Sequence, residues 1–222
     1  MNDLSPRRTP QQERSRERMR AIVEAARGLV GERGNDAVSV REIAAAAGVP
    51  ISSVYQYFPD KNAILRVLIV DYLDRVQTML GRILSEVRSV EDLPGATDRM
   101  IDALVRLFRR EPAMGTIWSA VQANTVLREI DLEDTRRVAE FMAALFLRIA
   151  PGADSDQVRD ACLWAAHMVP YTIRVAHHAP RRERERLIRE TKSLMRLRVL
   201  SLTPGQGRSA LEMQGFRQKG EF

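Results

Sequence analysis

Few side chains in this sequence have the type and spacing that catalysis needs. The 222 residues include three histidines and a single cysteine, Cys162. A metal site or a redox pair needs several such residues at short, regular intervals, and no such spacing occurs here. We also find no nucleophile elbow, no glycine-rich phosphate loop and no pair of carboxylates in a catalytic context. The sequence therefore predicts no enzyme, no metal site and no cofactor.

The composition favours a helical globular protein with an acidic partner. Hydrophobic residues make up 45% and charged residues 29% of the chain, and helix formers dominate. The net charge of the chain is +6. Residues 181–222 are its most basic part, with eleven basic and five acidic groups. A basic balance suggests nucleic acid or a membrane surface. Because no secretory signal and no membrane-spanning apolar run is found, we expect a soluble cytoplasmic protein, with Cys162 as a buried structural thiol.

Hydrophobic periodicity predicts an all-α chain. Apolar residues recur every three or four positions from Met19 to Val30, so we expect a helix from about residue 16 that Gly31 and Gly34 close, with Gly34 in a left-handed cap. Ser39 and Glu42 form a capping-box signature that opens a second, short helix, and Gly48 ends it. Further helices are expected at about 50–58, 61–87, 96–110, 113–128, 132–149, 155–178 and 181–201.

The first three of these helices predict a helix-turn-helix unit. Two short helices follow a longer one, and the turn between them contains Gly48. The alanine-rich segment 43–49 lets the short helices pack closely. In this arrangement the second short helix enters the DNA major groove while the first crosses above the backbone.

The residues of this unit resemble a known family. The pattern consists of Ala25, Ala26, Gly34, residues 40–44, residues 47–49, residues 54–58, Lys61 and Leu65. In this order and spacing it resembles the DNA-binding domain of the TetR family of transcriptional regulators, over about a fifth of the chain. Pro50 departs from the pattern, because the family more often has serine or threonine there as a helix cap.

The resemblance implies which side chains meet DNA. In the family, the first turns of the recognition helix contact bases, and the matching positions are Ile51, Ser52 and Ser53. Serine can bond to several base edges, whereas isoleucine can only touch a thymine methyl group. Tyr55, Gln56 and Tyr57 match family positions that usually meet the DNA backbone or base edges. Packing in the core is an alternative role for Tyr55.

Basic residues around this helix complete the implied DNA contacts. Lys61 matches a family phosphate contact at the start of the next helix, where the helix dipole also favours an anion. Arg41 lies on the exposed side of the support helix, and Arg16, Arg18 and Arg20 could reach the backbone or an adjacent minor groove. Each of these side chains could instead be a solvated surface charge.

In this family the later helices bind a ligand and form a dimer. We therefore expect a flexible arm over residues 1–15, a DNA-binding domain over 16–60, a ligand-binding and dimerisation domain over 61–202 and a disordered tail over 203–222. Segments 155–178 and 181–201 are apolar over a wide face, which suits a four-helix interface between two copies, although packing within the chain is the alternative. The candidate pocket residues are Met100, Leu104, Phe108, Trp118, Gln122, Met142, Phe146, Trp164, His167 and Tyr171.

These observations lead to one leading hypothesis and two alternatives. The leading hypothesis is a homodimeric repressor that a small hydrophobic ligand releases from a pseudo-palindromic operator in double-stranded DNA. The alternatives are a DNA-binding dimer that responds to no ligand, and a helical enzyme. For His167 a structural role is the alternative to ligand contact.

Overall fold

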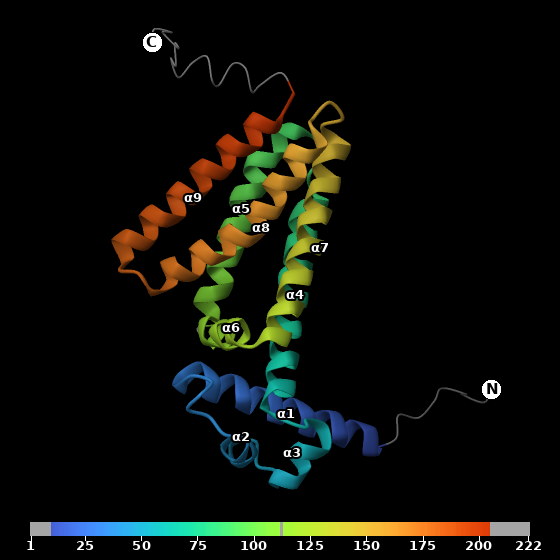
Figure 1. Cartoon of the computed structure of the whole chain (residues 1–222), viewed down its shortest axis with the longest axis vertical. Coiled ribbons are helices and arrows are strands. Elements are labelled where there is room, and N and C mark those ends of the chain that lie inside the picture. The colour runs from blue at the N-terminus through green and yellow to red at the C-terminus, as the bar shows by residue number, and fades with distance from the viewer. Residues whose placement is uncertain (1–9, 112, 205–222) are drawn as a thin grey trace, which may run out of the picture. The chain divides into compact units, whose positions relative to one another are not determined.

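The computed structural model describes residues 10–111 and 113–204, and every regular element within these ranges is helical (Figure 1). The elements are α1 (Pro10–Arg33), α2 (Val40–Ala46), α3 (Ile51–Tyr57), α4 (Lys61–Ser85), the 3-10 turn η1 (Val90–Asp92), α5 (Leu93–Arg110), α6 (Ala113–Ala123), α7 (Thr125–Ile149), α8 (Ser155–His178) and α9 (Arg181–Leu202). The predicted all-α fold is confirmed. Each described helix is too short or too polar to cross a lipid bilayer.

The helices form two compact units. The first contains α1, α2, α3, α4 as far as Tyr72, α6, and α7 as far as Glu129. The second contains the rest of α4, η1, α5, the rest of α7, α8 and α9. The unit that holds the helix-turn-helix therefore extends beyond the domain predicted over residues 16–60, since α6 belongs to it.

The first unit is built around a core to which every one of its early helices contributes. Ile22 and Val30 of α1, Ile43 of α2, Val54 of α3 and Leu68 of α4 have no exposed surface. Since α2 and α3 have only seven residues each, they are too short to be stable in isolation. Their position depends on this shared burial.

The predicted signals at the helix ends are confirmed. Gly34 ends α1 with a φ of 84°, and its amide donates to the Val30 carbonyl at 3.0 Å. The Glu42 amide donates to Ser39 Oγ at 3.3 Å, while the Ser39 amide donates to the Glu42 carboxylate at 2.8 Å. Gly48 ends α2 with a φ of 66°, which favours glycine in the turn before α3.

Two expectations for α1 are wrong. The helix begins at Pro10, so residues 10–15 are helical, whereas residues 1–9 of the predicted arm lie outside the described residues. Gly31 lies inside the helix and does not close it. A Cβ atom built on Gly31 would lie 2.4 Å from the Cβ of Ala113 in α6. The missing side chain therefore lets α1 and α6 approach each other closely.

We expect Gly31→Ala to destabilise the protein by about 1–3 kcal/mol, because the new methyl group overpacks the contact with α6. Gly28→Ala is the matched control in the same helix, since a Cβ at Gly28 meets nothing within 4 Å. It should stabilise the protein by about 0.5–1 kcal/mol. Urea unfolding measures both. Equal effects of the two substitutions would show that the α1–α6 contact imposes no such constraint.

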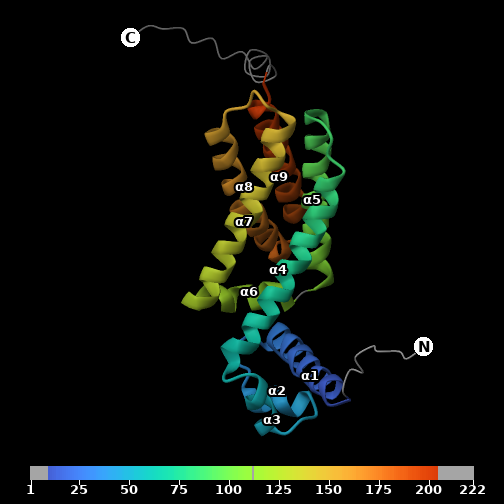
Figure 2. The ribbon, with the colours of Figure 1, turned by 90° about the vertical axis from the view of Figure 1, so that its right-hand side faces the viewer.

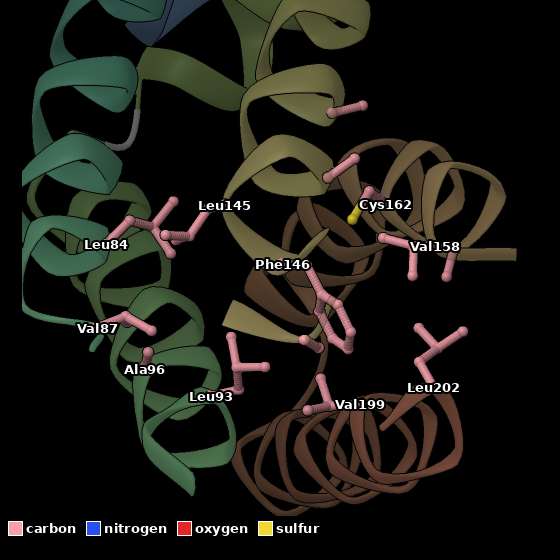
Figure 3. Packing of buried hydrophobic residues seen from close by; sticks show 14 residues of the cluster. Leu84, Val87, Leu93, Ala96, Leu145, Phe146, Val158, Cys162, Val199 and Leu202 are labelled. Carbon is pink, nitrogen blue, oxygen red and sulfur yellow. The ribbon is translucent and has the colours of Figure 1, made fainter. Parts of the chain in front are cut away.

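In the second unit, α5, α8 and α9 lie side by side (Figures 1 and 2). Figure 3 shows the core of this unit, an apolar cluster to which α4, α5, α7, α8 and α9 contribute and which includes Phe146 of α7 and Cys162 of α8. Cys162 is buried, which confirms the expectation of a buried thiol, and this burial raises the pKa of the thiol to about 11. Two ion pairs join α9 to α5: Lys192 contacts Asp102 at 2.6 Å, and Arg196 Nε donates to Asp98 at 2.9 Å.

Several predicted boundaries in the later helices are wrong. Helix α5 begins at Leu93, so Pro94 lies in its first turn, where a missing amide costs nothing. The break expected between about 128 and 132 falls at Asn124, whose Oδ1 accepts from the Leu127 amide at 3.1 Å and so caps α7. Of the predicted tail, Thr203 is buried and donates to the Val199 carbonyl at 3.0 Å, while residues 205–222 lie outside the described residues.

Candidate nucleic-acid interface

Helices α2 and α3 form the predicted helix-turn-helix. They are joined by residues 47–50, and both pack against α1 (Figure 1). Ile43, Ala44 and Val54 are buried where they meet. Pro50 precedes α3 and contributes no side-chain cap, and its carbonyl accepts from the Ser53 amide at 2.9 Å. The geometry holds α3 by burial on one side and leaves its other side open.

The open side of α3 carries hydrogen-bonding groups. Ser52 and Gln56 are exposed, Tyr55 is 52% exposed, and Ile51 is 38% exposed. Ser53 is half-buried. Of the two roles considered for Tyr55, this exposure favours a contact outside the chain over packing in the core. A short helix with hydroxyl and amide groups on its outer face can reach base edges and phosphates.

The start of α1 is tied to the recognition helix. Ser15 Oγ donates to the Tyr57 hydroxyl at 3.0 Å, and Tyr57 is half-buried. The sequence analysis placed Ser15 in the flexible arm and so missed this contact. The available signal was the spacing, because Ser15 lies four residues before the apolar Met19 and would share one side of a helix with it. Arg18 follows Ser15 by three residues and so lies on the same side of α1. Both Arg16 and Arg18 are exposed, as is Arg41 near the start of α2.

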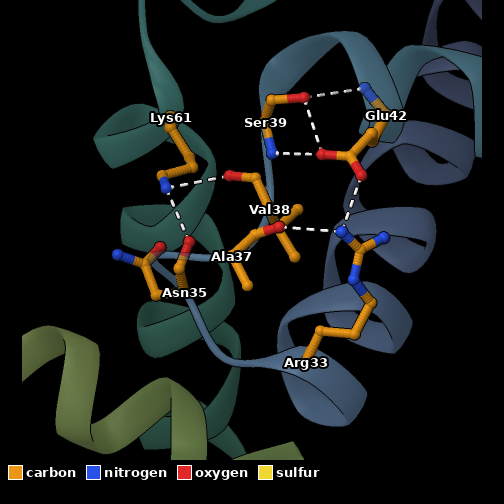
Figure 4. A network of polar contacts seen from close by, with 7 residues as sticks. All are labelled: Arg33, Asn35, Ala37, Val38, Ser39, Glu42 and Lys61. Carbon is orange, nitrogen blue, oxygen red and sulfur yellow. Dashed lines mark hydrogen bonds and ion pairs between the residues drawn. The ribbon is translucent and has the colours of Figure 1, made fainter.

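Charged side chains surround the loop between α1 and α2 (Figure 4). Arg33 donates to the Ala37 carbonyl at 2.8 Å and to the Glu42 carboxylate at 2.6 Å. From the other side, Lys61 Nζ donates to the carbonyls of Asn35 at 2.7 Å and Val38 at 3.0 Å. The ammonium group for which the sequence predicted a phosphate contact thus has partners inside the chain.

Hydrogen bonds from Arg33 and then from Ser39 lower the pKa of Glu42 to about 2. The carboxylate therefore stabilises the fold above its ordinary pKa of 4.5, and this stabilisation is lost as the pH falls through about 2. We expect Glu42→Gln to lower the melting temperature at pH 7 and to differ little from wild type near pH 2. Glu32→Gln, which removes an exposed carboxylate from α1, controls for the change in net charge. A Glu42→Gln deficit of equal size at both pH values would contradict this assignment.

Part of the predicted ligand pocket lies in the second unit. Leu104 and Phe108 of α5 and Phe146 of α7 are buried there. Met100 and Met142 are half-buried and pack against the core shown in Figure 3. These five apolar residues therefore belong to one compact unit.

The other predicted pocket residues lie either in the first unit or on an exposed helix face. Trp118 and Gln122 lie on α6 in the first unit, where Trp118 meets Tyr72 edge to face with ring centroids 6.1 Å apart. Trp164 and Tyr171 are 53% and 54% exposed on the outer face of α8, and His167 is exposed with them. Sequence periodicity placed these residues on a helix but could not tell which neighbours each face would meet.

Comparison with known proteins supports a helix-turn-helix regulator. Residues 22–68 match the family model described as bacterial regulatory proteins, tetR family, and residues 91–202 match the one described as tetracyclin repressor-like, C-terminal domain. The HTH-type transcriptional regulator BetI of Rhizobium meliloti (strain 1021) is 23% identical over 151 residues, which cover 64% of this chain and 71% of that protein.

Solved structures agree with these matches. A TetR-family transcriptional regulator from Streptomyces coelicolor is 26% identical, with a TM-score of 0.63 over 83% of this chain and 99% of that one. A transcriptional regulator from Rhodococcus sp. Rha1 is 17% identical, with a TM-score of 0.66 over 82% of this chain and 96% of that one. The protein is thus a DNA-binding transcriptional regulator. Specifically, the chain belongs to the TetR family.

Proposed function

We propose that this regulator is a homodimeric repressor that binds a pseudo-palindromic operator and is released by a small hydrophobic ligand. The observation that carries the proposal is the exposed polar face of α3 on a well-packed helix-turn-helix. Ile51, Ser52 and Ser53 would read base edges from the first turn of that helix. Tyr55, Gln56 and Tyr57 would meet the backbone or base edges, as the family pattern implies. As a DNA-binding repressor, the protein would act in the cytoplasm.

Basic side chains would position the helix-turn-helix on the DNA duplex. Arg41 on α2 and Arg16 and Arg18 on α1 are exposed, and the Ser15–Tyr57 hydrogen bond ties that part of α1 to α3. Arginine contacts to phosphate add affinity without reading sequence. The first 61 residues contain ten basic and eight acidic groups, so their net charge is small. The positions of these arginines therefore matter more for DNA binding than the net charge of the segment.

We expect Ser52→Ala and Gln56→Ala each to lose discrimination at a few base pairs, on the order of 1 kcal/mol, because their side chains meet base edges. Fluorescence anisotropy with DNA from upstream of the gene, compared with scrambled DNA, measures the change. Ser119→Ala on α6 is the control, since its hydroxyl donates to the Gly115 carbonyl of its own helix. If both α3 variants keep wild-type affinity and preference, sequence is read from Ile51 or from DNA shape.

A second copy of the chain would cover the outer faces of α8 and α9. Leu163, Trp164 and Tyr171 of α8 and Leu194 and Leu197 of α9 are between 41% and 54% exposed. Soluble proteins rarely leave so many large apolar side chains open on adjacent helices. Two such helices from each copy would form a four-helix interface about a two-fold axis. On this view Trp164, His167 and Tyr171 belong to the dimer interface.

We expect Leu194→Glu combined with Leu197→Glu to turn the dimer into a monomer, because four carboxylates cannot be buried across the two-fold axis. Multi-angle light scattering at micromolar concentration reports the mass. Val126→Glu is the control, since Val126 is an apolar residue 66% exposed on α7 outside these faces. A wild-type protein that stays monomeric would refute the dimer, and a dimer that survives the double substitution would place its interface elsewhere.

The proposed effector would enter the second unit beside Met100 and Met142. Both methionines are half-buried at the margin of the apolar core, and flexible thioether side chains adapt to varied ligand shapes. A hydrophobic ligand that raises the melting temperature and releases operator DNA is the expected result of a compound screen. A DNA-binding dimer that responds to no compound would support the ligand-independent alternative.

A further inference from the structure

The loop between α1 and α2 is held by an ammonium group from a helix that begins 22 residues later. Lys61 is the first residue of α4, and its Nζ reaches back to two carbonyls of this loop, Asn35 and Val38. The side chain is half-buried. The loop leads into Ser39, the cap of α2, and Val38 is only 2% exposed. Lys61 therefore joins the start of α4 to the start of α2.

We propose that Lys61 is a positioning residue, which acts on DNA binding through this loop and does not bind phosphate. The proposal rests on the proposed operator binding. An ammonium group has three donors, and two of them are already used in charge-assisted hydrogen bonds to backbone carbonyls. Moving Nζ to a phosphate would leave those carbonyls without this donor in a half-buried place.

The local charges also disfavour a phosphate at this helix end. Asp60 directly precedes Lys61, and its carboxylate accepts from the Ala63 amide at 2.8 Å. The Ala63 amide at the start of α4 is thus already partnered by a negative side chain, which also interacts with the helix dipole. An approaching phosphate would meet this carboxylate.

The contact closes a ring around the recognition helix. The chain runs from the loop through α2, the turn and α3 to α4, and α3 is joined to α4 by residues 58–60 alone. Lys61 returns from the end of this path to its beginning. With the ring closed, the direction of α3 is fixed at both ends. Without it, α3 would sample several directions, and specific binding would weaken more than nonspecific binding.

The test uses Lys61→Met, which keeps the apolar stem and removes the donors. Operator and scrambled DNA are titrated over roughly 50 to 300 mM salt, below the melting temperature of each variant. We expect operator affinity to fall by roughly 10- to 100-fold, with the salt slope and the affinity for scrambled DNA unchanged. Arg66→Met removes an exposed positive charge from the next turns of α4 and is the matched control.

Two results would overturn the proposal. One is a salt slope lowered by about one unit with parallel losses on both DNAs, which is the signature of a phosphate contact. The other is an unchanged operator affinity. If Lys61→Met does not fold, Lys61→Gln takes its place. Its amide can donate to one carbonyl, so we expect a smaller loss of operator affinity relative to wild type, again with the salt slope unchanged. A wild-type protein that fails to bind its operator would instead refute the proposed function.

Discussion

The DNA-reading unit depends on the burial of helices that are too short to stand alone. Helices of seven residues cannot offset the cost of nucleation in water, so α2 and α3 persist because their apolar sides enter a core shared with α1 and α4. This constraint divides the recognition helix into two sides. Val54 and Phe58 are buried, which leaves Ser52, Tyr55 and Gln56 exposed on the other side of the helix. The same packing therefore both fixes α3 in place and leaves its polar side exposed.

The same physics explains why α8 and α9 point to a second copy. Their inner sides fill the core of the second unit through Val158, Cys162 and Val199, yet Trp164 and Leu194 remain about half exposed on their outer sides. A helix that is apolar on two sides needs two partners. The single chain supplies one of them, and in the proposed dimer the second copy would supply the other.

The sequence was most informative where local chemistry decides the structure. The capping box at Ser39 and Glu42 and the left-handed cap at Gly34 were predicted because they depend on residues only a few positions apart. Gly31 was misjudged, since its role is to admit Ala113, which lies 82 positions away in the sequence. The contact of Lys61 with the loop was missed for the same reason. A lysine at a helix start suggests a phosphate contact when only its own helix is considered. The two carbonyls that Lys61 contacts are brought within its reach only by the tertiary fold.

Pocket residues were the least predictable part of the candidate site. Periodicity identifies the apolar side of a helix, but it cannot distinguish a core, a dimer interface and a ligand cavity, because all three select the same side chains. Phe146 and Trp164 look alike in sequence, yet one is 5% and the other 53% exposed. Assigning them to different roles requires knowing which helices are neighbours.

In the proposed mechanism, the signal would pass along continuous helices. The boundary between the units falls inside α4, after Tyr72, and inside α7, after Glu129. Five residues past the first boundary, Gln77 donates to the buried carboxylate of Asp134 on α7. Burial raises the pKa of Asp134, while Arg137 and Gln77 oppose that shift. Asp134 also accepts a hydrogen bond from Arg137 of its own helix at 3.2 Å, so loss of the Gln77 contact would remove one of these two partners. A ligand that separated α4 from α7 at this level would have to break the Gln77–Asp134 contact.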